Sequence, residues 1–333
     1  MSKKVLEVKD VFFDAVNVNK SYRSSHVRLL NGVSVKFESG RVTAIMGSNG
    51  SGKSTLVNLI IGRMLRGSKT SGKIIYCGEE NRNPEIWAEK TAFLEQKEVY
   101  IKSLSVEEYL KYEIKFYRKD LNSNEQEKLL FDVMNKAEII HKRYETIEDL
   151  SGGEIKKAMI ADVLLQNAEV IFMDEPTSWL DSWNASVFIK TMKEVAESKN
   201  LIIAIIINQP GQELFEQFDD LIFIKPGGNL FYSGPISEVD EFLTKKSLIK
   251  PEGMPTVNYL LSLRSSNTDS TIPVEGHTIP NYSITSSEVT YSGLNQIFTG
   301  KSFSFTDLFT ILKRRFSYGI AENDFGLMFF GKL

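Results

Sequence analysis

The segment from Gly47 to Thr55 constrains the fold of this chain more than any other. It matches the phosphate-binding pattern G-x-x-x-x-G-K-[ST], with Thr55 as an extra hydroxyl after the match. The residues before it, 41–46, are apolar and rich in β-branched side chains, which is typical of a buried strand. The residues after it, 56–61, are apolar at helical spacing. The sequence therefore predicts a strand, a glycine loop and a helix that together bind an anion.

The residue types in this loop suit a nucleoside triphosphate with Mg²⁺. Its glycines permit backbone angles and a close approach that a Cβ would prevent. Lys53 can place an ammonium against the β- and γ-phosphates, and Ser54 can offer a hydroxyl to Mg²⁺. A chance glycine turn before a helix is the alternative, and the flanking strand and helix argue against it. The predicted phosphate-binding positions are Gly47, Ser48, Asn49, Gly50, Ser51, Gly52, Lys53, Ser54 and Thr55.

Length and charge narrow the class of protein. A chain of 333 residues is long enough for one large domain or two smaller ones. The formal net charge of -3 gives no sign of a nucleic-acid partner. The single cysteine, Cys77, excludes an internal disulfide. The most apolar run, Leu201 to Ile207, is far shorter than the roughly 18 residues that a spanning helix needs, so we expect no membrane span in this chain.

A second glycine turn and an acidic strand end follow in the second half of the chain. Leu150-Ser151-Gly152-Gly153-Glu154 precedes a predicted helix over residues 155–166 and forms another potential anion site. Residues 170–173 predict a buried strand that ends at Asp174 and Glu175. We expect Asp174 to order Mg²⁺ and Glu175 to polarise an attacking water. Two acids in the first turn of a helix are the alternative, which the intact phosphate loop disfavours.

The remaining segments indicate a β-rich N-terminal part and an inserted helical part. Tyr22 lies in a polar segment before the phosphate loop, where it could stack on a purine or serve as an ordinary surface or core aromatic. A short apolar run ends in the amide Gln96. The pattern is then helical, interrupted at Asn122-Ser123-Asn124, where Ser123 or Asn124 is expected to cap the second helix.

The order of these pieces resembles the nucleotide-binding domain of ABC transporters. The phosphate loop, Gln96, the Leu-Ser-Gly-Gly turn and the apolar-Asp-Glu strand occur in that family in the same sequence. Five shorter segments are similar to subfamily G, the white-type half-transporters: 174–181, 207–210, 213–215, 218–219 and 231–234. The resemblance is strong over about residues 5–245 and loose in the tail.

The resemblance implies an α/β fold of the P-loop NTPase type with an ABC ATPase core. A β-rich subdomain would precede a helical subdomain inserted at about residues 97–165. The nucleotide-binding domain would cover residues 1–245, with an extension and polar linker over 246–293. Residues 294–333 would form a basic amphipathic tail that approaches a membrane domain absent from this chain.

The resemblance also implies roles for single residues. Gln96 would contact Mg²⁺ and the coupling interface, and Asp174 and Glu175 would be the metal ligand and the catalytic base. Ser151, Gly152 and Gly153 would bind the γ-phosphate of ATP held by an opposite subunit. ATP would then lie between two such domains, identical or different, whose closure drives a membrane partner. The protein would power transport from the cytoplasmic face of a membrane.

Two residues depart from the family pattern. The family has His where this chain has Asn208, and an amide cannot carry a positive charge. We therefore expect slow hydrolysis with Asn208 in the catalytic site. The family also has Gly where this chain has Trp179, which should alter packing between two domains. A stand-alone, non-transport ATPase or ATP-binding regulator with weak hydrolysis is the alternative function.

Overall fold

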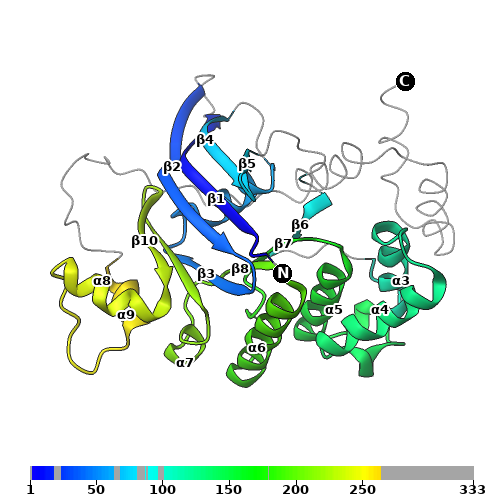
Figure 1. Cartoon of the computed structure of the whole chain (residues 1–333). Helices are drawn as coiled ribbons and strands as arrows, with labels where there is room; N and C mark the ends of the chain where they lie inside the picture. Colours follow the sequence, from blue (N-terminus) through cyan, green and yellow to red (C-terminus); the bar gives the residue numbers. More distant parts are fainter. Residues whose placement is uncertain are drawn as a thin grey trace.

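The computed structural model describes residues 2–18, 24–63, 68–80, 87, 89–96, 101–178 and 180–263 of the chain. Two sheets form its centre (Figure 1). The larger has six strands in the order β10-β9-β3-β8-β7-β6, and the smaller has four in the order β2-β1-β4-β5. Two residues named above, Tyr22 and Trp179, lie outside the described residues. The chain from residue 264 onward, which includes the predicted basic tail, also lies outside them.

The larger sheet is parallel except at one edge. Its strands are β3 (Arg41–Gly47), β6 (Thr91–Leu94), β7 (Val170–Asp174), β8 (Ile202–Ile206), β9 (Asp220–Lys225) and β10 (Asn229–Pro235). Only β10 runs antiparallel to its neighbour, β9. Every residue of β7 and β8 is buried, as expected for strands covered on both faces. The predicted buried strands before the phosphate loop and before Asp174 are thus confirmed.

Alternate residues of these strands pack into two different cores. Val42, Ala44 and Met46 belong to a core shared with the helices on one face of the sheet. Ile45, between them, belongs to a second core with the smaller sheet and helix α1 (Lys53–Ile60). This alternation is the period of two that a strand imposes on its side chains. It fixes β3, and hence the loop that follows it, between two layers.

The smaller sheet is antiparallel and is formed by the N-terminal part of the chain. Its strands are β1 (Val5–Val18), β2 (Ser24–Glu38), β4 (Lys69–Tyr76) and β5 (Glu79–Glu80). An edge-to-face contact joins Phe37 on β2 to Phe172 on β7, with ring centroids 5.8 Å apart. The sheet therefore covers the strand that carries Asp174.

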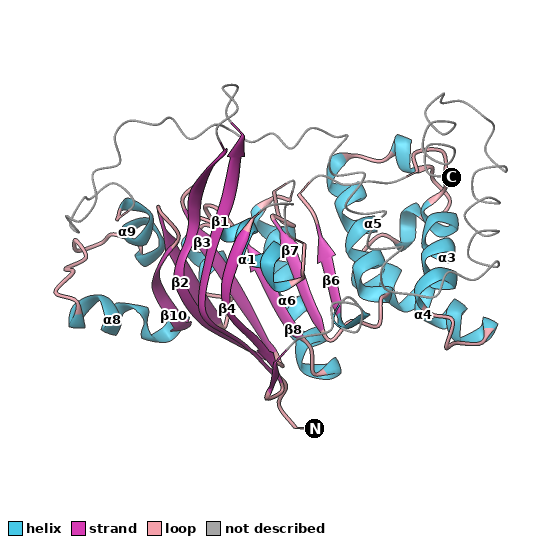
Figure 2. Ribbon diagram, turned by 90° about the horizontal axis from the view of Figure 1, so that it is seen from above, coloured by secondary structure: helices cyan, strands magenta, loops and turns pink. Residues whose placement is uncertain are grey.

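Three helices pack together beyond the β6 edge of the larger sheet. They are α3 (Val106–Tyr117), α4 (Ser123–Lys136) and α5 (Gly152–Leu165), and Figures 1 and 2 show them as one block. All three lie within the insertion predicted at 97–165, whose exact limits remain a prediction. The cap of α4 is Asn122, not Ser123 or Asn124 as expected. Asn122 is the position from which Glu125 completes a capping box.

The other helices cover the larger sheet and its opposite edge. Helix α6 (Ser182–Lys199) packs on β3 and β8. Helix α7 (Gln212–Phe215) follows β8 in the chain. Helices α8 (Val239–Lys245) and α9 (Thr256–Ser262) lie near β10 in Figure 2. Short 3-10 turns occur at Ile140–Lys142, Ile147–Asp149 and Ile236–Glu238. Within the described ranges, no helix has the length and apolar character that crossing a membrane requires.

Candidate nucleotide-binding site

The loop between β3 and α1 has a backbone that only glycine can form. Gly47, Gly50 and Gly52 have φ angles of 153°, 76° and 101°. A Cβ on Gly47 would lie 2.2 Å from the carbonyl oxygen of Ile224, on the neighbouring strand β9. A Cβ on Gly52 would lie 2.7 Å from the carbonyl oxygen of Leu29. The loop is therefore packed against two strands, and its shape is determined before any ligand binds.

The Lys53 side chain lies inside this loop and forms hydrogen bonds with its backbone. Lys53 begins α1, is 6% exposed, and its Nζ donates to the carbonyl oxygens of Gly47 at 3.1 Å and Ser48 at 3.0 Å. The hydroxyls of Ser48 and Ser51 are buried and have no hydrogen-bond partner among the described residues. Buried polar groups normally have partners, so these hydroxyls and the lysine ammonium suit an anion as their partner. The loop has the donors that the phosphates of ATP require.

Ser54 and Asp174 form the second part of the site. The Ser54 hydroxyl donates to Asp174 Oδ2 at 3.0 Å, joining the start of α1 to the end of β7. Burial raises the pKa of the Asp174 carboxyl, which is 9% exposed. The hydrogen bond from Ser54 and, to a smaller extent, the cations Lys53 and Lys156 oppose this rise. Among the described residues, no group of three or more His, Cys, Asp or Glu side chains is arranged to hold a metal ion by itself. One carboxylate and one hydroxyl fit Mg²⁺, which usually takes few protein ligands and completes its shell with phosphate and water.

Glu175 lies one residue further, at the same edge of the sheet. Its φ is +50°, an uncommon angle for a residue with a side chain, and its N–H donates to the carbonyl oxygen of Ile206 at 3.0 Å. Asn208 Nδ2 donates a hydrogen bond to Glu175 Oε1. The carboxylate is therefore held by the end of the adjacent strand, β8. A hollow of about 230 Å³, lined by both residues among others, lies beside this pair.

Gln96 lies at the same edge of the sheet but is exposed. Leu94 on β6 pairs with Met173 on β7, so Gln96 and Asp174 both follow the ends of neighbouring strands. The residue before it, Glu95, forms an ion pair with Arg63 through its side chain. This position is consistent with the predicted metal contact of Gln96.

The Ser151-Gly152-Gly153 turn lies apart from these residues. Ser151 caps α5, and its N–H donates to Glu154 Oε2 at 2.8 Å. Ser151 and Gly152 are exposed. In the described part of the chain, no hydrogen bond joins this turn to the phosphate loop. The start of α5 is thus open to solvent.

One buried charged residue near the site, Lys156, is not among the residues predicted from the sequence. Lys156, on α5, is fully buried, and its Nζ lies 3.5 Å from the carbonyl oxygen of Glu95, which precedes Gln96. It therefore links the helix that begins at the glycine turn to the strand end that carries Gln96. A signal was available, because Lys156 shares a helical face with the buried Ile160 and Val163.

Comparison with known families finds two matches along the chain. The family model described as ABC transporter matches residues 30–178, and the one described as ABC-2 type transporter matches residues 208–272. The first match contains the phosphate loop, the Ser-Gly-Gly turn and Asp174 with Glu175.

Individual relatives agree with these matches. An ABC transporter-like protein of Encephalitozoon cuniculi is 35% identical over 272 residues, which are 79% of this chain and 46% of that protein. Rat ATP-binding cassette sub-family G member 5 is 30% identical over 259 residues, 76% of this chain and 39% of the relative. Rice ABC transporter G family member 38 is 34% identical over 220 residues, 63% of this chain and 14% of the relative. The chain thus corresponds to less than half of each relative.

A solved structure shares the fold. It is a dimeric bacterial ABC transporter cassette, with a TM-score of 0.59 and 20% sequence identity. The similarity covers 69% of this chain and 98% of the cassette. The same cassette, solved as a dimer in a post-hydrolysis state with ADP and phosphate, gives the same TM-score. The described chain therefore shares the fold of these cassettes.

Proposed function

Because the chain contains an ABC transporter ATP-binding domain of the G family, we propose that it binds and hydrolyses ATP to power transport across a membrane. It would act on the cytoplasmic face, together with a second ATP-binding domain and a membrane domain. The observation that carries the proposal is the Ser54–Asp174 hydrogen bond. This bond joins the phosphate loop to the acidic strand end, and Glu175 follows directly.

In this proposal, different residues bind the phosphates, hold the metal ion and activate the attacking water. The backbone N–H groups of the phosphate loop and the Lys53 ammonium would hold the β- and γ-phosphates. Ser54, Asp174 and Gln96 would hold Mg²⁺, which when bound offsets the negative charge of the phosphates. Glu175 would accept a proton from the attacking water as its oxygen bonds to the γ-phosphorus. The bond from that phosphorus to the bridging oxygen then breaks, giving ADP and phosphate.

Asn208 would limit the rate of ATP hydrolysis. Its amide holds the Glu175 carboxylate through a neutral donor, where a histidine could supply a charged one. The pair can orient the base, but it adds no positive charge beside the γ-phosphate. We therefore infer that ATP binding is strong and hydrolysis is slow.

A second domain would complete the site. The phosphate loop leaves Asn49 and Gly50 exposed, and the Ser151-Gly152-Gly153 turn is largely exposed as well. Pairing two copies, or this chain with a related one, would bring each turn to the other's ATP. The dimeric state of the similar cassettes supports this arrangement. Substrate and direction would be set by the membrane domain.

The test is ATP-dependent pairing of a Glu175→Gln variant, which keeps the shape of the site but removes the base. Light scattering with saturating ATP and Mg²⁺ should give a dimer mass, and the protein without nucleotide should give a monomer mass. A monomer under both conditions would refute the paired site.

Asn208 favours one alternative, a stand-alone ATPase or ATP-binding regulator without a transport role. Cell fractionation distinguishes the two functions. A transport role predicts that the endogenous protein sediments with membranes and co-purifies with an ABC membrane domain. The regulator role predicts a protein in the soluble fraction that has no such partner.

A further inference from the structure

One fully buried cation, Lys156, takes no part in the hydrolysis proposed above. It lies on the buried face of α5 with Met159 and Val163. Its Nζ donates to the carbonyl oxygen of Glu95 at 3.5 Å. Lysine is rarely buried completely, because removing an ammonium from water costs free energy. A methionine of similar length would fill the same space without that cost, so packing alone does not explain the charge.

The ammonium contacts the strand end that carries the proposed metal ligands. Glu95 and Asp174 follow the paired ends of the neighbouring strands β6 and β7. Gln96 comes directly after Glu95. The ammonium also opposes the rise in the pKa of the Asp174 carboxyl. Lys156 thus holds the backbone beside one proposed Mg²⁺ ligand and acts on the charge of another.

The same helix carries the Ser151-Gly152-Gly153 turn at its start. Ser151 and Glu154 form a capping box, in which the Glu154 N–H donates to Ser151 Oγ at 3.3 Å and the Ser151 N–H donates to Glu154 Oε2 at 2.8 Å. These bonds join the glycine turn to the body of the helix. Lys156 follows the cap by five residues, which is about 7.5 Å along the helix. A displacement of α5 therefore moves the turn and the ammonium together.

We propose that Lys156 is a positioning residue that couples Gln96, at the ATP site of its own chain, to the glycine turn that would meet the ATP of a second chain. The inference rests on the proposed function, since the turn acts on ATP only in a pair. As Gln96 takes up its contact with Mg²⁺, the carbonyl of Glu95 moves with it, and the ammonium carries that shift to α5. ATP bound to one chain thereby sets the position of the turn before the second chain arrives.

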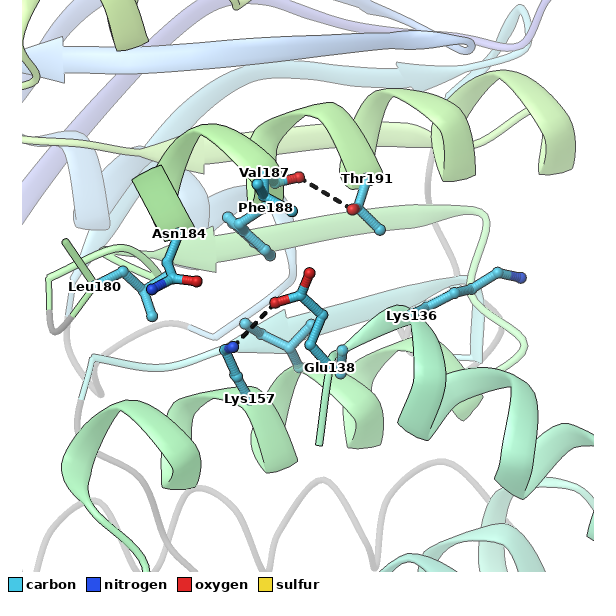
Figure 3. A pocket seen from close by; sticks show the side chains of 10 residues that line it. Lys136, Glu138, Lys157, Leu180, Asn184, Val187, Phe188 and Thr191 are labelled. Atoms are coloured by element: carbon cyan, nitrogen blue, oxygen red, sulfur yellow. Dashed lines mark hydrogen bonds and ion pairs between the residues drawn. The ribbon is translucent and has the colours of Figure 1, made fainter. Parts of the chain in front are cut away.

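The next lysine on the same helix provides a matched control. Lys157 is rotated by about 100° from Lys156. Figure 3 shows its side chain in a pocket between α5 and α6, where its Nζ lies 3.0 Å from Glu138 Oε2. Glu138 is exposed, and it is not part of the strand end at Glu95. Lys157→Met therefore removes a lysine from α5 and leaves the proposed link intact.

The first experiment measures the turn in the absence of a second chain. Lys156→Met and Lys157→Met are each made in the full-length Glu175→Gln protein, which is diluted until it is monomeric. Hydrogen exchange of the amides of residues 151–155 is compared with and without ATP and Mg²⁺. In the parent and in Lys157→Met, ATP should change the exchange rate by at least about fivefold, the lower end of typical coupling between sites. In Lys156→Met the change should be less than about twofold.

Steady-state hydrolysis separates a positioning role from a structural one. In the protein with its native Glu175, Lys156→Met should lower kcat by about 10- to 100-fold, the usual effect of removing a group that holds a metal ligand in place. KM for ATP should change by less than about twofold, because the phosphate loop is intact. If Lys156→Met does not fold, Lys156→Gln tests the same prediction, since its shorter, neutral side chain also breaks the link.

The outcomes are distinguishable. If the Glu175→Gln parent does not bind ATP in titration calorimetry, the proposed function fails and the inference fails with it. If the parent binds ATP but exchange in residues 151–155 does not respond, or if Lys156→Met responds as the parent does, only the inference is overturned. A change in kcat no larger than the change in KM would also overturn it.

Discussion

The side-chain amide of Asn208 donates a hydrogen bond to the carboxylate of Glu175, so the residues that follow β8 and β7 meet at the edge of the sheet. A neutral donor thus holds the proposed base. Replacing it with a donor that can carry charge should change the rate without changing the fold, because Asn208 is only partly buried.

Asn208→His should raise the rate of ATP hydrolysis by about five- to tenfold. A charge-assisted hydrogen bond is worth roughly 1 kcal/mol more than a neutral one, and the imidazolium would also face the γ-phosphate. Steady-state phosphate release measures the effect. Asn124→His, on the surface of α4, is the matched control. An unchanged or lower rate would refute the idea of a weakened site.

Lys53→Ala should weaken ATP binding by roughly 10- to 100-fold, the range that corresponds to losing a charged hydrogen bond worth about 1.5–3 kcal/mol. The ammonium already lies inside the loop, bonded to two of its carbonyl oxygens. Titration calorimetry with ATP measures the loss. Lys245→Ala, on the exposed surface of α8, controls for the removal of a lysine. Unchanged affinity in Lys53→Ala would refute the assignment of the loop.

Local patterns predicted much of the core. The apolar runs at 41–46 and 170–173 predict β3 and β7 to within a residue, because buried parallel strands consist almost entirely of apolar residues. The P-loop NTPase fold and the resemblance to subfamily G are confirmed by the comparisons. The roles of the site residues and the domain limits remain predictions.

Two features of the site could not be predicted from the sequence because they depend on tertiary contacts. The bond between Asn208 and Glu175 requires β7 and β8 to be neighbours, although helix α6 separates them in the chain. The burial of Lys156 requires α5 to pack against β6. The predicted cap of α4, Ser123 or Asn124, differs for a local reason: Asn122 and Glu125 form a capping box, which places the cap one or two residues earlier.

Asp174→Asn should make the protein more stable while it abolishes Mg²⁺-dependent hydrolysis. Burial raises the pKa of this carboxyl, so at neutral pH the folded state bears the cost of a buried charge. The neutral amide removes that cost. We expect the melting temperature to rise by about 2–4 °C, the shift that ~1 kcal/mol gives a domain of this size. Asp132→Asn, on α4, is the control, and a lower melting temperature in Asp174→Asn would contradict the account.

Glu107 should make stability depend on pH in acid. The hydrogen bond from Arg143 lowers the pKa of the Glu107 carboxyl to about 2, although burial of the side chain opposes the shift. In the unfolded chain a glutamate titrates near 4.3, so this contribution is complete above about pH 5. It is lost as the pH falls from there towards 2.

Glu107→Gln should therefore lower the free energy of unfolding at pH 7 by roughly 1.5–3 kcal/mol, as expected for a charged hydrogen bond. The difference from the parent should shrink at pH 3. Urea unfolding at both pH values measures it. Glu241→Gln, in an exposed pair with Lys245, should have little effect at either pH. A difference that is equal at both pH values would contradict the role of the Arg143 pair.

The central claim is that the phosphate loop of one chain and the Ser151-Gly152-Gly153 turn of another form one ATP site. Mixing two defective chains tests it most directly, with Glu175→Gln present in both. Lys53→Ala disables the loop. Gly152→Asp disables the turn, because its carboxylate would repel the γ-phosphate while remaining favourable at the start of α5.

Native mass spectrometry of the equimolar mixture with ATP and Mg²⁺ is the decisive measurement. The account predicts a heterodimer that holds one ATP, formed by the intact loop of one chain and the intact turn of the other, while neither variant alone gives a dimer. The absence of this heterodimer, or dimers of equal abundance from either variant alone, would contradict the shared site.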